Sequence, residues 1–435
     1  MSTPSRILDR RTFLRAGTVG IGFGAASACG WLRALAAEAP ARGVKSVIVL
    51  WMNGGPATID LWDLKSGHDN GGPFREIETA APGLRISEHL PRLAGFGQDL
   101  AIIRSMTTRE GDHERATFLG RTGYTPQGAI QFPAIGSVLA RELSAGDGDL
   151  PSYVSIAAPR RMAPAGGGFL GPTFAPLAIG EGAAGSGLGV DESLVVPDLA
   201  LASGIAASKQ DGRLNLLAEL DGRFQSARPS QVGDSLRSAV RRASRLMRPE
   251  AAGAFRLDDE PTSRREQYGK TLFGQGCLLA RRLVERGVPF IEVSLDGWDT
   301  HQNNFDRVRE LSGTLDAGFA ALLGDLKDRG LLDSTLVVCQ GEFGRTPKVN
   351  GQTGRDHWPR SWAVALAGGG LRTGQAIGRT SDDGLQVDDR PVSIPDLIAT
   401  VAKGVGIDPQ HQNMSNVGRP IRVADPSAKP IQELL

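Results

Sequence analysis

Apolar runs alternate with amphipathic stretches along most of this chain, and the two patterns predict different elements. Continuous runs of β-branched and other apolar residues are typical of strands buried on both faces. They occupy residues 44–52, 99–106, 153–157, 289–295, 334–339 and 362–366. Apolar positions at helical spacing predict helices over residues 132–143, 230–247, 264–286, 303–329 and 394–404.

The order of these elements predicts the fold class. A strand, a long amphipathic helix and a second strand follow one another between residues 289 and 339. Such a unit is right-handed with parallel strands, so we expect a mostly parallel central sheet with helices on both faces. Residues 160–190 are rich in Gly, Ala and Pro without a regular period, which predicts a long surface insertion. We therefore expect one α/β domain over residues 40–435, with loop insertions.

The first residues have the three-part layout of a targeting segment. Arg10 and Arg11 precede a Gly/Ala-rich stretch over residues 16–28, and small residues suited to signal peptidase come next. This predicts a twin-arginine signal over residues 1–39 and a periplasmic or secreted mature protein; the alternative is a basic start of a cytosolic domain. The apolar stretch is too short to remain as a transmembrane anchor, so we expect none after signal removal. Lipid attachment at Cys29 is a further alternative.

Charge and cysteine content restrict the partners and the covalent chemistry. With 49 basic and 48 acidic residues, the chain has no net field to attract nucleic acid or an anionic membrane. Partners must be selected by a local site, and the oligomeric state stays open. Beyond the predicted signal, Cys277 and Cys339 lie in apolar runs. This favours buried thiols over a disulfide, although an oxidising compartment permits one.

Four polar segments stand in loops that follow predicted strands. In open parallel sheets, ligands bind outside the carboxyl ends of the strands, so these loops indicate where a site would form. They are residues 53–56 (Asn-Gly-Gly-Pro), 296–301 (Asp-Gly-Trp-Asp-Thr-His), 341–346 (Gly-Glu-Phe-Gly-Arg-Thr) and 354–358 (Gly-Arg-Asp-His-Trp).

Two of the six histidines, His301 and His357, lie in these loops beside carboxylates. A divalent metal is held by imidazole and carboxylate groups that converge from different loops, and each His is oriented by a second acceptor. Both kinds of role could be filled by Asp296, Asp299, Glu342 and Asp356. The alternative is that each Asp–His pair caps a helix or ties a loop, and Asp299, which precedes a helix, suits that role.

Three further residues are candidates for the chemistry. His113 follows the second predicted strand and could act as ligand, base or nucleophile, or be a solvated loop residue. Arg115 and Arg345 suit an anionic ester, because a guanidinium fork matches phosphate or sulfate oxygens. Either arginine could equally be a salt-bridge partner.

Taken together, the order of the four loop motifs resembles the alkaline phosphatase and sulfatase superfamily. The set Gly-Gly-Pro, Gly-Trp-Asp-Thr-His, Gly-Glu-Phe-Gly-Arg-Thr-Pro and Gly-Arg-Asp-His-Trp-Pro resembles one exported family in it without an assigned activity, the domain of unknown function 1501. This resemblance implies an alkaline-phosphatase-like fold over nearly the whole mature chain. It also implies a divalent metal held by Asp296, His301 and His357, with Glu342 and Asn53 beside it. Zinc, manganese or calcium would be the cation, and the ligand types suit iron as well.

The sequence also departs from the superfamily pattern. Asn53 stands where the first strand usually ends in Asp, and Phe343 stands where a second metal site would have His. Asp60 or Asp63 could replace the missing carboxylate. No Cys or Ser lies at the offset of the sulfatase nucleophile; the nearby hydroxyls belong to Thr107, Thr108 and Thr117.

Two functions remain open from the sequence. The resemblance implies an exported metal-dependent hydrolase of phosphate or sulfate esters, acting on a small-molecule or saccharide ester. Arg115 or Arg345 would then clamp the anion, and His113 or a nearby Thr would attack or transfer a proton. The alternative is a non-catalytic sulfatase-like binding or assembly protein of the cell envelope, with a structural metal or none.

Overall fold

The computed structural model describes residues 43–144, 148–162, 166–183, 189–201, 203–228 and 231–435. Arg42–Leu435 forms one compact unit. The predicted signal over residues 1–39 and Cys29 lie outside the described residues. Within the described residues, no helix has the length and apolar character needed to cross a membrane.

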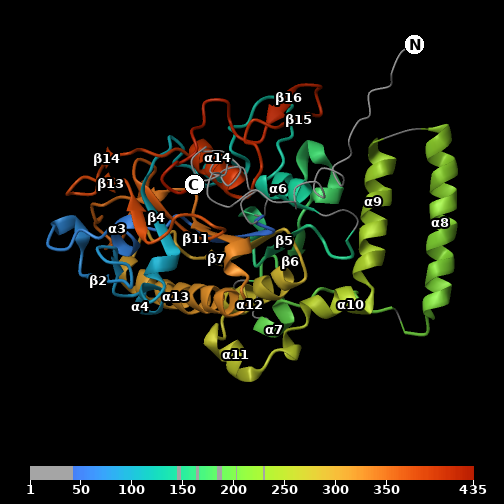
Figure 1. Ribbon diagram of the computed structural model, residues 1–435, viewed down its shortest axis with the longest axis horizontal. Coiled ribbons are helices and arrows are strands. Elements are labelled where there is room, and N and C mark those ends of the chain that lie inside the picture. The colour runs from blue at the N-terminus through green and yellow to red at the C-terminus, as the bar shows by residue number, and fades with distance from the viewer. Residues whose placement is uncertain (1–42, 145–147, 163–165, 184–188, 202, 229–230) are drawn as a thin grey trace, which may run out of the picture. The chain divides into compact units, whose positions relative to one another are not determined.

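In the part of the chain that the structure describes, eight strands form one central sheet (Figure 1). Their spatial order is β12, β4, β11, β8, β1, β7, β5, β6. The bounds are β1 Ser46–Asn53, β4 Leu100–Met106, β5 Tyr153–Ile156, β6 Leu177–Ile179, β7 Phe290–Asp296, β8 Thr335–Gln340, β11 Trp362–Gly368 and β12 Gln375–Ile377.

The sheet is mostly parallel, as predicted. Strand β1 lies near its centre and pairs in parallel with β7 on one side and β8 on the other. Among the described strands of this sheet, β11 runs antiparallel to both of its neighbours, β4 and β8. Every residue of β1 is buried, which explains why its sequence is a continuous apolar run rather than an alternating one.

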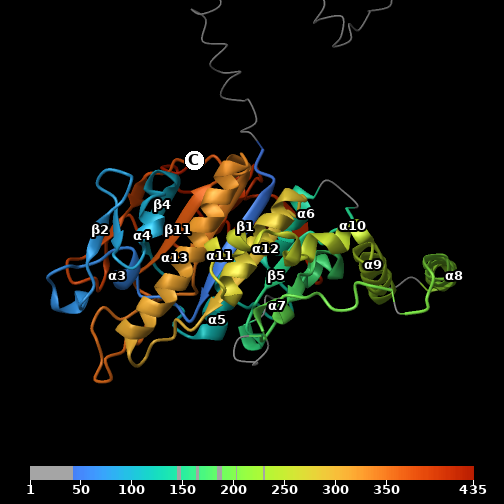
Figure 2. The same ribbon diagram turned by 90° about the horizontal axis from the view of Figure 1, so that it is seen from below.

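Helices cover both faces of the sheet, and β1 shows how its sequence serves the two layers. Because successive side chains point to opposite faces, Ile48, Leu50 and Met52 join one core cluster. Val47, Val49 and Trp51 join the other. The first face is covered by α12 (Leu272–Glu285), α13 (Asn304–Asp328) and α4 (Pro91–Ala94), as Figure 2 shows, and the second by α5 (His113–Thr122), α6 (Ile135–Leu143) and α14 (Ile394–Gly404).

The remaining elements are short or lie at the periphery. Two-stranded ribbons pair β2 (Glu76–Glu78) with β3 (Arg85–Ser87), β9 (Gly344–Arg345) with β10 (His357–Trp358), β13 (Arg379–Thr380) with β14 (Val387–Asp389), and β15 (Gln412–Met414) with β16 (Pro420–Arg422). The other α-helices are α3 (Thr58–Leu61), α7 (Val190–Ser193), α8 (Ala207–Ala227), α9 (Gln231–Leu246), α10 (Pro249–Ala252) and α11 (Thr262–Gln267).

One helical expectation needs correction, and one further helix was not expected. Residues 264–286 form not one helix but parts of two, α11 and α12. Between them Tyr268 turns inward, where its hydroxyl donates to Asp325 over 2.9 Å, and Thr271 caps the start of α12. The helix α8 was not predicted; none of its side chains is buried, and its apolar residues Leu216, Leu220 and Phe224 are exposed.

The Gly-rich stretch at residues 160–190 is also more ordered than predicted. Its described residues include short 3-10 turns and β6, which pairs in parallel with β5 at the sheet edge. Three residues are too few for a visible strand period. The expectation of buried thiols is confirmed, since Cys277 and Cys339 are both free and buried.

Candidate functional site

The carboxyl ends of three adjacent strands bring the predicted loops together. In the sheet register, Asn53 of β1 pairs with Asp296 of β7, and Trp51 pairs with Gln340 of β8. The loops that follow β7 and β8 therefore leave the sheet side by side. His357 comes from β10, which pairs with β9, so that His357 lies opposite Arg345.

A further histidine reaches this point from the other side. His113 is the first residue of α5, and Asp112 caps that helix by accepting from the backbone N–H of Arg115. Gly120 of α5 lies against the ring of Trp51, where a Cβ atom would come within 2.9 Å of it. Close packing of α5 on β1 thus directs its first residue toward the strand ends.

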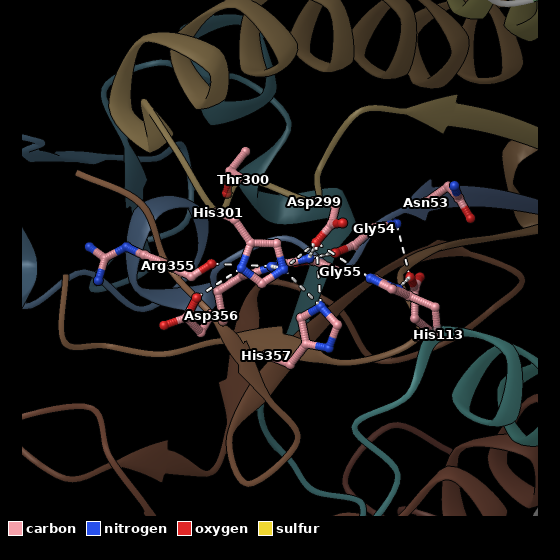
Figure 3. A network of polar contacts seen from close by, with 12 residues as sticks. Asn53, Gly54, Gly55, His113, Asp299, Thr300, His301, Arg355, Asp356 and His357 are labelled. Atoms are coloured by element: carbon pink, nitrogen blue, oxygen red, sulfur yellow. Dashed lines mark hydrogen bonds and ion pairs between the residues drawn. The ribbon is translucent and has the colours of Figure 1, made fainter. Parts of the chain in front are cut away.

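Three imidazole nitrogens converge on one carboxylate oxygen, as Figure 3 shows. The Nε2 atoms of His113, His301 and His357 lie 3.4, 3.1 and 3.4 Å from Oδ1 of Asp299. The Nε2 atoms of His301 and His357 are 3.1 Å apart. Ligand atoms of His113, Asp299 and His357 all lie within 4.8 Å of one another, which is the spacing of a candidate cation site.

The opposite nitrogen of each ring has its own acceptor. Nδ1 of His113 lies 2.7 Å from Oε1 of Glu342, and Nδ1 of His301 lies 2.8 Å from Oδ1 of Asp356. Nδ1 of His357 lies 2.7 Å from the carbonyl oxygen of Gly111. When the rings are neutral, acceptors at all three Nδ1 atoms favour the tautomer that carries its proton there, which turns the Nε2 lone pairs toward the shared centre.

This arrangement fits a divalent cation. Two neutral Nε2 atoms only 3.1 Å apart repel one another unless a proton or a cation lies between them. Imidazole nitrogens with a neighbouring carboxylate, each ring held by a second acceptor, are the donors that zinc, manganese and iron prefer. The residues present would hold the cation through His113, His301, His357 and Asp299.

The charges of the cluster are strongly coupled. Burial lowers the pKa of His113, but its contacts with Asp299 and Glu342 outweigh burial and raise the pKa to about 9. Burial raises the pKa of Asp299, whereas His113, His357 and Arg345 together bring it well below the usual range. Asp299 is therefore ionised at neutral pH, and positive charge is favoured beside it.

The structure places the two predicted arginines in different roles. The side chain of Arg345 is fully buried, and its three nitrogens donate to the carbonyl groups of Gly54, Gly55 and Arg355 and to Asp299. Its Nη1 also lies 3.3 Å from Nε2 of His301.

Arg115 is exposed and forms a two-pronged pair with Glu110. Both guanidinium groups are thus engaged by oxygens of the protein in this structure.

The carboxylate that contacts the histidines stands three residues after Asp296, the one predicted. Asp296 is exposed at the end of β7, and its Oδ1 accepts from Nδ2 of Asn53 over 2.7 Å. It is Asp299 that contacts the histidines. The reason lies in Trp298, which is fully buried and whose backbone N–H donates to the carbonyl oxygen of Asn53, so that the loop turns its next residue into the site.

Of the two residues expected beside the metal, Glu342 contacts the histidine cluster through His113, whereas the side chain of Asn53 contacts Asp296. Glu342 is fully buried, and its Oε1 also accepts the backbone N–H of Gly54 over 2.9 Å. Among the described residues, Oε2 of Glu342 and Oδ1 of Asn53 are buried oxygens without a hydrogen-bond partner. The ring of Phe343 lies against those of His113 and His357, at centroid distances of 4.9 and 4.8 Å.

The proposed replacement carboxylates lie elsewhere. Asp60 is fully buried and accepts from Arg355 and Asn304, while Asp63 pairs with Lys65 and accepts from Thr380. Both carboxylates are engaged in contacts within the protein.

The carbonyl oxygen of Gly111, which holds the ring of His357, could not be predicted from the sequence, because a backbone acceptor carries no residue signature.

Comparison with solved structures found distant likenesses. Ps i-CgsB, solved in complex with k-i-k-neocarrahexaose, is 12% identical with a TM-score of 0.40, over 84% of this chain and 72% of that chain. PsFucS1 sulfatase from Pseudoalteromonas sp. is 13% identical with a TM-score of 0.35, over 87% and 71% of the two chains. For the lipoteichoic acid synthase LtaP from Listeria monocytogenes the values are 10%, 0.37, 89% and 76%. Likeness at this level carries no conclusion about activity or substrate.

Comparison with curated proteins found no match. The family model described as "Protein of unknown function (DUF1501)" matches residues 44–435. The match includes all strands of the central sheet and all residues of the candidate site. The chain therefore belongs to the DUF1501 family.

Proposed function

We propose that the chain is an exported, metal-dependent hydrolase of phosphate or sulfate esters. The observation that carries the proposal is the convergence of three Nε2 atoms on Oδ1 of Asp299, with an acceptor behind every ring. Hydrogen bonds that only hold the loops together would not require three imidazoles to meet at one carboxylate oxygen. The location at the carboxyl ends of parallel strands is where small ligands bind in such sheets.

The protein residues would bind and orient the cation. His113, His301 and His357 offer lone pairs, and Glu342, Asp356 and the Gly111 carbonyl hold the rings in place. When bound, a divalent cation acts as a Lewis acid toward an ester oxygen. The substrate in this proposal is a small-molecule or saccharide ester, and the predicted twin-arginine signal supports a reaction in the periplasm or outside the cell.

One observation favours a second candidate function. Arg345 has all three guanidinium nitrogens engaged by the protein, and Arg115 is paired with Glu110. Guanidinium groups that the protein already engages fit a binding or assembly protein of the cell envelope, in which the metal is structural.

Metal analysis and ester turnover together test the proposal. The purified chain is dialysed against zinc, manganese or calcium, its metal content is measured, and hydrolysis of aryl phosphate and aryl sulfate esters is followed. We expect one class of tightly bound cation and turnover that a chelator abolishes. His357→Ala should lose both metal and turnover while keeping the circular dichroism spectrum of the unchanged chain.

His411→Ala is the matched control, because His411 is an exposed histidine that faces Glu142 rather than the cluster. It should retain metal and turnover. Tight metal binding that depends on His357, without turnover of any ester tested, would establish the binding protein instead. Absence of metal binding with all three cations would reject both the catalytic and the structural metal site.

A further inference from the structure

A buried carboxylate lies behind the candidate site and joins the loops that carry its histidines. Asp60 belongs to α3, directly after β1, and none of its surface is exposed. Its two oxygens accept from Arg355, Nη2 to Oδ1 over 2.8 Å and Nε to Oδ2 over 2.9 Å. The oxygen Oδ2 also accepts from Nδ2 of Asn304 over 2.8 Å.

Each partner of Asp60 stands a few residues from a histidine of the site. Arg355 precedes His357 by two residues, and Asn304 follows His301 by three. Asn304 in turn accepts from the hydroxyl of Thr300 over 2.6 Å. Figure 3 shows Thr300 and Arg355 on the two loops, directly beside the imidazole cluster.

The two loops are also tied to one another. The backbone N–H of Arg355 donates to the carbonyl oxygen of Thr300, and that of Asn304 donates to the carbonyl oxygen of Thr353, both over 2.9 Å. A Cβ atom on Gly354 would come within 1.8 Å of the carbonyl oxygen of His301, so the backbones are in direct contact. The spacing of His301 and His357 thus depends on how this pair of loops is held.

We propose that Asp60 is a positioning residue: it sets the spacing of His301 and His357 through its salt bridge to Arg355 and its hydrogen bond from Asn304. The part of this inference that concerns cation affinity rests on the proposed function. Asp60 and Arg355 are both fully buried, and Asp60 is the one carboxylate paired with Arg355 among the described residues. The guanidinium also donates to the carbonyl oxygens of Asn70, Thr346 and Pro347, so that without the carboxylate its buried charge is drawn further toward these carbonyl groups or toward water. Either movement shifts the loop that carries His357.

The substitution Asp60→Asn tests this role, because it preserves shape while removing the charge. We expect its affinity for Zn²⁺, measured by calorimetric titration of the metal-free chain, to fall about 10- to 100-fold, as for other groups that orient metal ligands. In the metal-free protein, amide hydrogen exchange should rise together in residues 297–304 and 346–358. Should Asp60→Asn not fold, Thr300→Val, which removes only the hydroxyl bonded to Asn304, should show the same two effects at smaller size.

Asp325→Asn is the matched control. Asp325 is equally buried and paired with arginines, but on α13 against Arg281 and Arg264. It should lower stability while leaving Zn²⁺ affinity and exchange in the two loops unchanged. Unchanged Zn²⁺ affinity in Asp60→Asn, or faster exchange spread over the chain as in Asp325→Asn, would overturn the inference. If the unsubstituted chain binds none of zinc, manganese and calcium, the proposed function fails, while the exchange measurement still decides whether Asp60 positions the loops.

Discussion

Nδ1 of His113 lies 2.7 Å from Oε1 of Glu342, the same oxygen that accepts the backbone N–H of Gly54. One buried carboxylate thus fixes both a histidine of the cluster and the loop that follows β1. The contact also joins segments 229 residues apart, so it depends on the complete sheet.

The substitution Glu342→Gln should weaken cation binding without unfolding the chain. The amide keeps an acceptor for one neighbour but removes the negative charge that helps to orient His113, and we expect affinity to fall by roughly 10- to 100-fold. Competition with a metal-sensitive chelator measures the loss. Glu110→Gln, which affects only the exposed pair with Arg115, should bind the cation normally. Equal affinity in Glu342→Gln and the unchanged chain would show that Glu342 does not support the site.

Gly54→Ala should destabilise the fold and disturb the site together. Gly54 has φ near +110°, and a Cβ there would lie 2.4 Å from the backbone nitrogen of Asp299. Strain and overlap together should lower the free energy of unfolding by about 2–4 kcal/mol, measured by urea denaturation. Gly83→Ala, at φ near +79° with no atom within 4 Å, isolates the strain and should cost roughly 1 kcal/mol. A similar loss in both variants would contradict the close approach to Asp299.

Arg345→Lys should lower the stability of the fold strongly, although both side chains carry a positive charge. A lysine cannot reproduce three nitrogens that bond to three carbonyl oxygens and Asp299, and breaking a buried charged contact costs about 3–5 kcal/mol. Denaturant unfolding checks this value. Arg115→Lys, at an exposed pair, should change stability by less than about 1 kcal/mol. Normal stability in Arg345→Lys would argue for a substrate-facing arginine after all.

The two buried cysteines should resist alkylation in the native chain. Burial raises the pKa of both thiols, Cys277 and Cys339, and the thiolate is the reactive form. Iodoacetamide labelling followed by mass spectrometry should find both unmodified at neutral pH and both modified in denaturant. Rapid native labelling of either residue would show that this part of the core opens readily.

The sequence predicted those parts of the fold that rest on repeated local pattern. The buried strands β1, β7 and β8 appear as apolar runs, and α13 shows seven apolar positions at helical spacing, so their existence and order were predictable. The helix α8 was not predicted, although Leu216, Leu220 and Phe224 recur in it at helical spacing; none of its side chains is buried. The break between α11 and α12 depends on Tyr268 reaching Asp325, a contact 57 residues away in the chain.

The candidate site, like the fold, could be predicted only in part. The loops were predictable, because strand ends of a parallel sheet meet at one edge. The choice between Asp296 and Asp299 was not. It depends on the burial of Trp298 and on its backbone bond to Asn53, which rotate the second carboxylate inward. The hydrogen bonds of the Arg345 guanidinium could likewise not be predicted, because their acceptors are backbone carbonyl oxygens of other loops.

The central place of β1 has a consequence for how the chain reaches its native state. Strands that begin at Phe290 and Thr335 pair with the two edges of β1. This strongly apolar strand therefore stands early in the chain, whereas both of its partners are synthesised much later. Pairing over such sequence separations is slow, and an unpaired apolar strand invites association with other chains. Until residue 340 has emerged from the ribosome, β1 lacks the two strands that cover its edges in the folded chain.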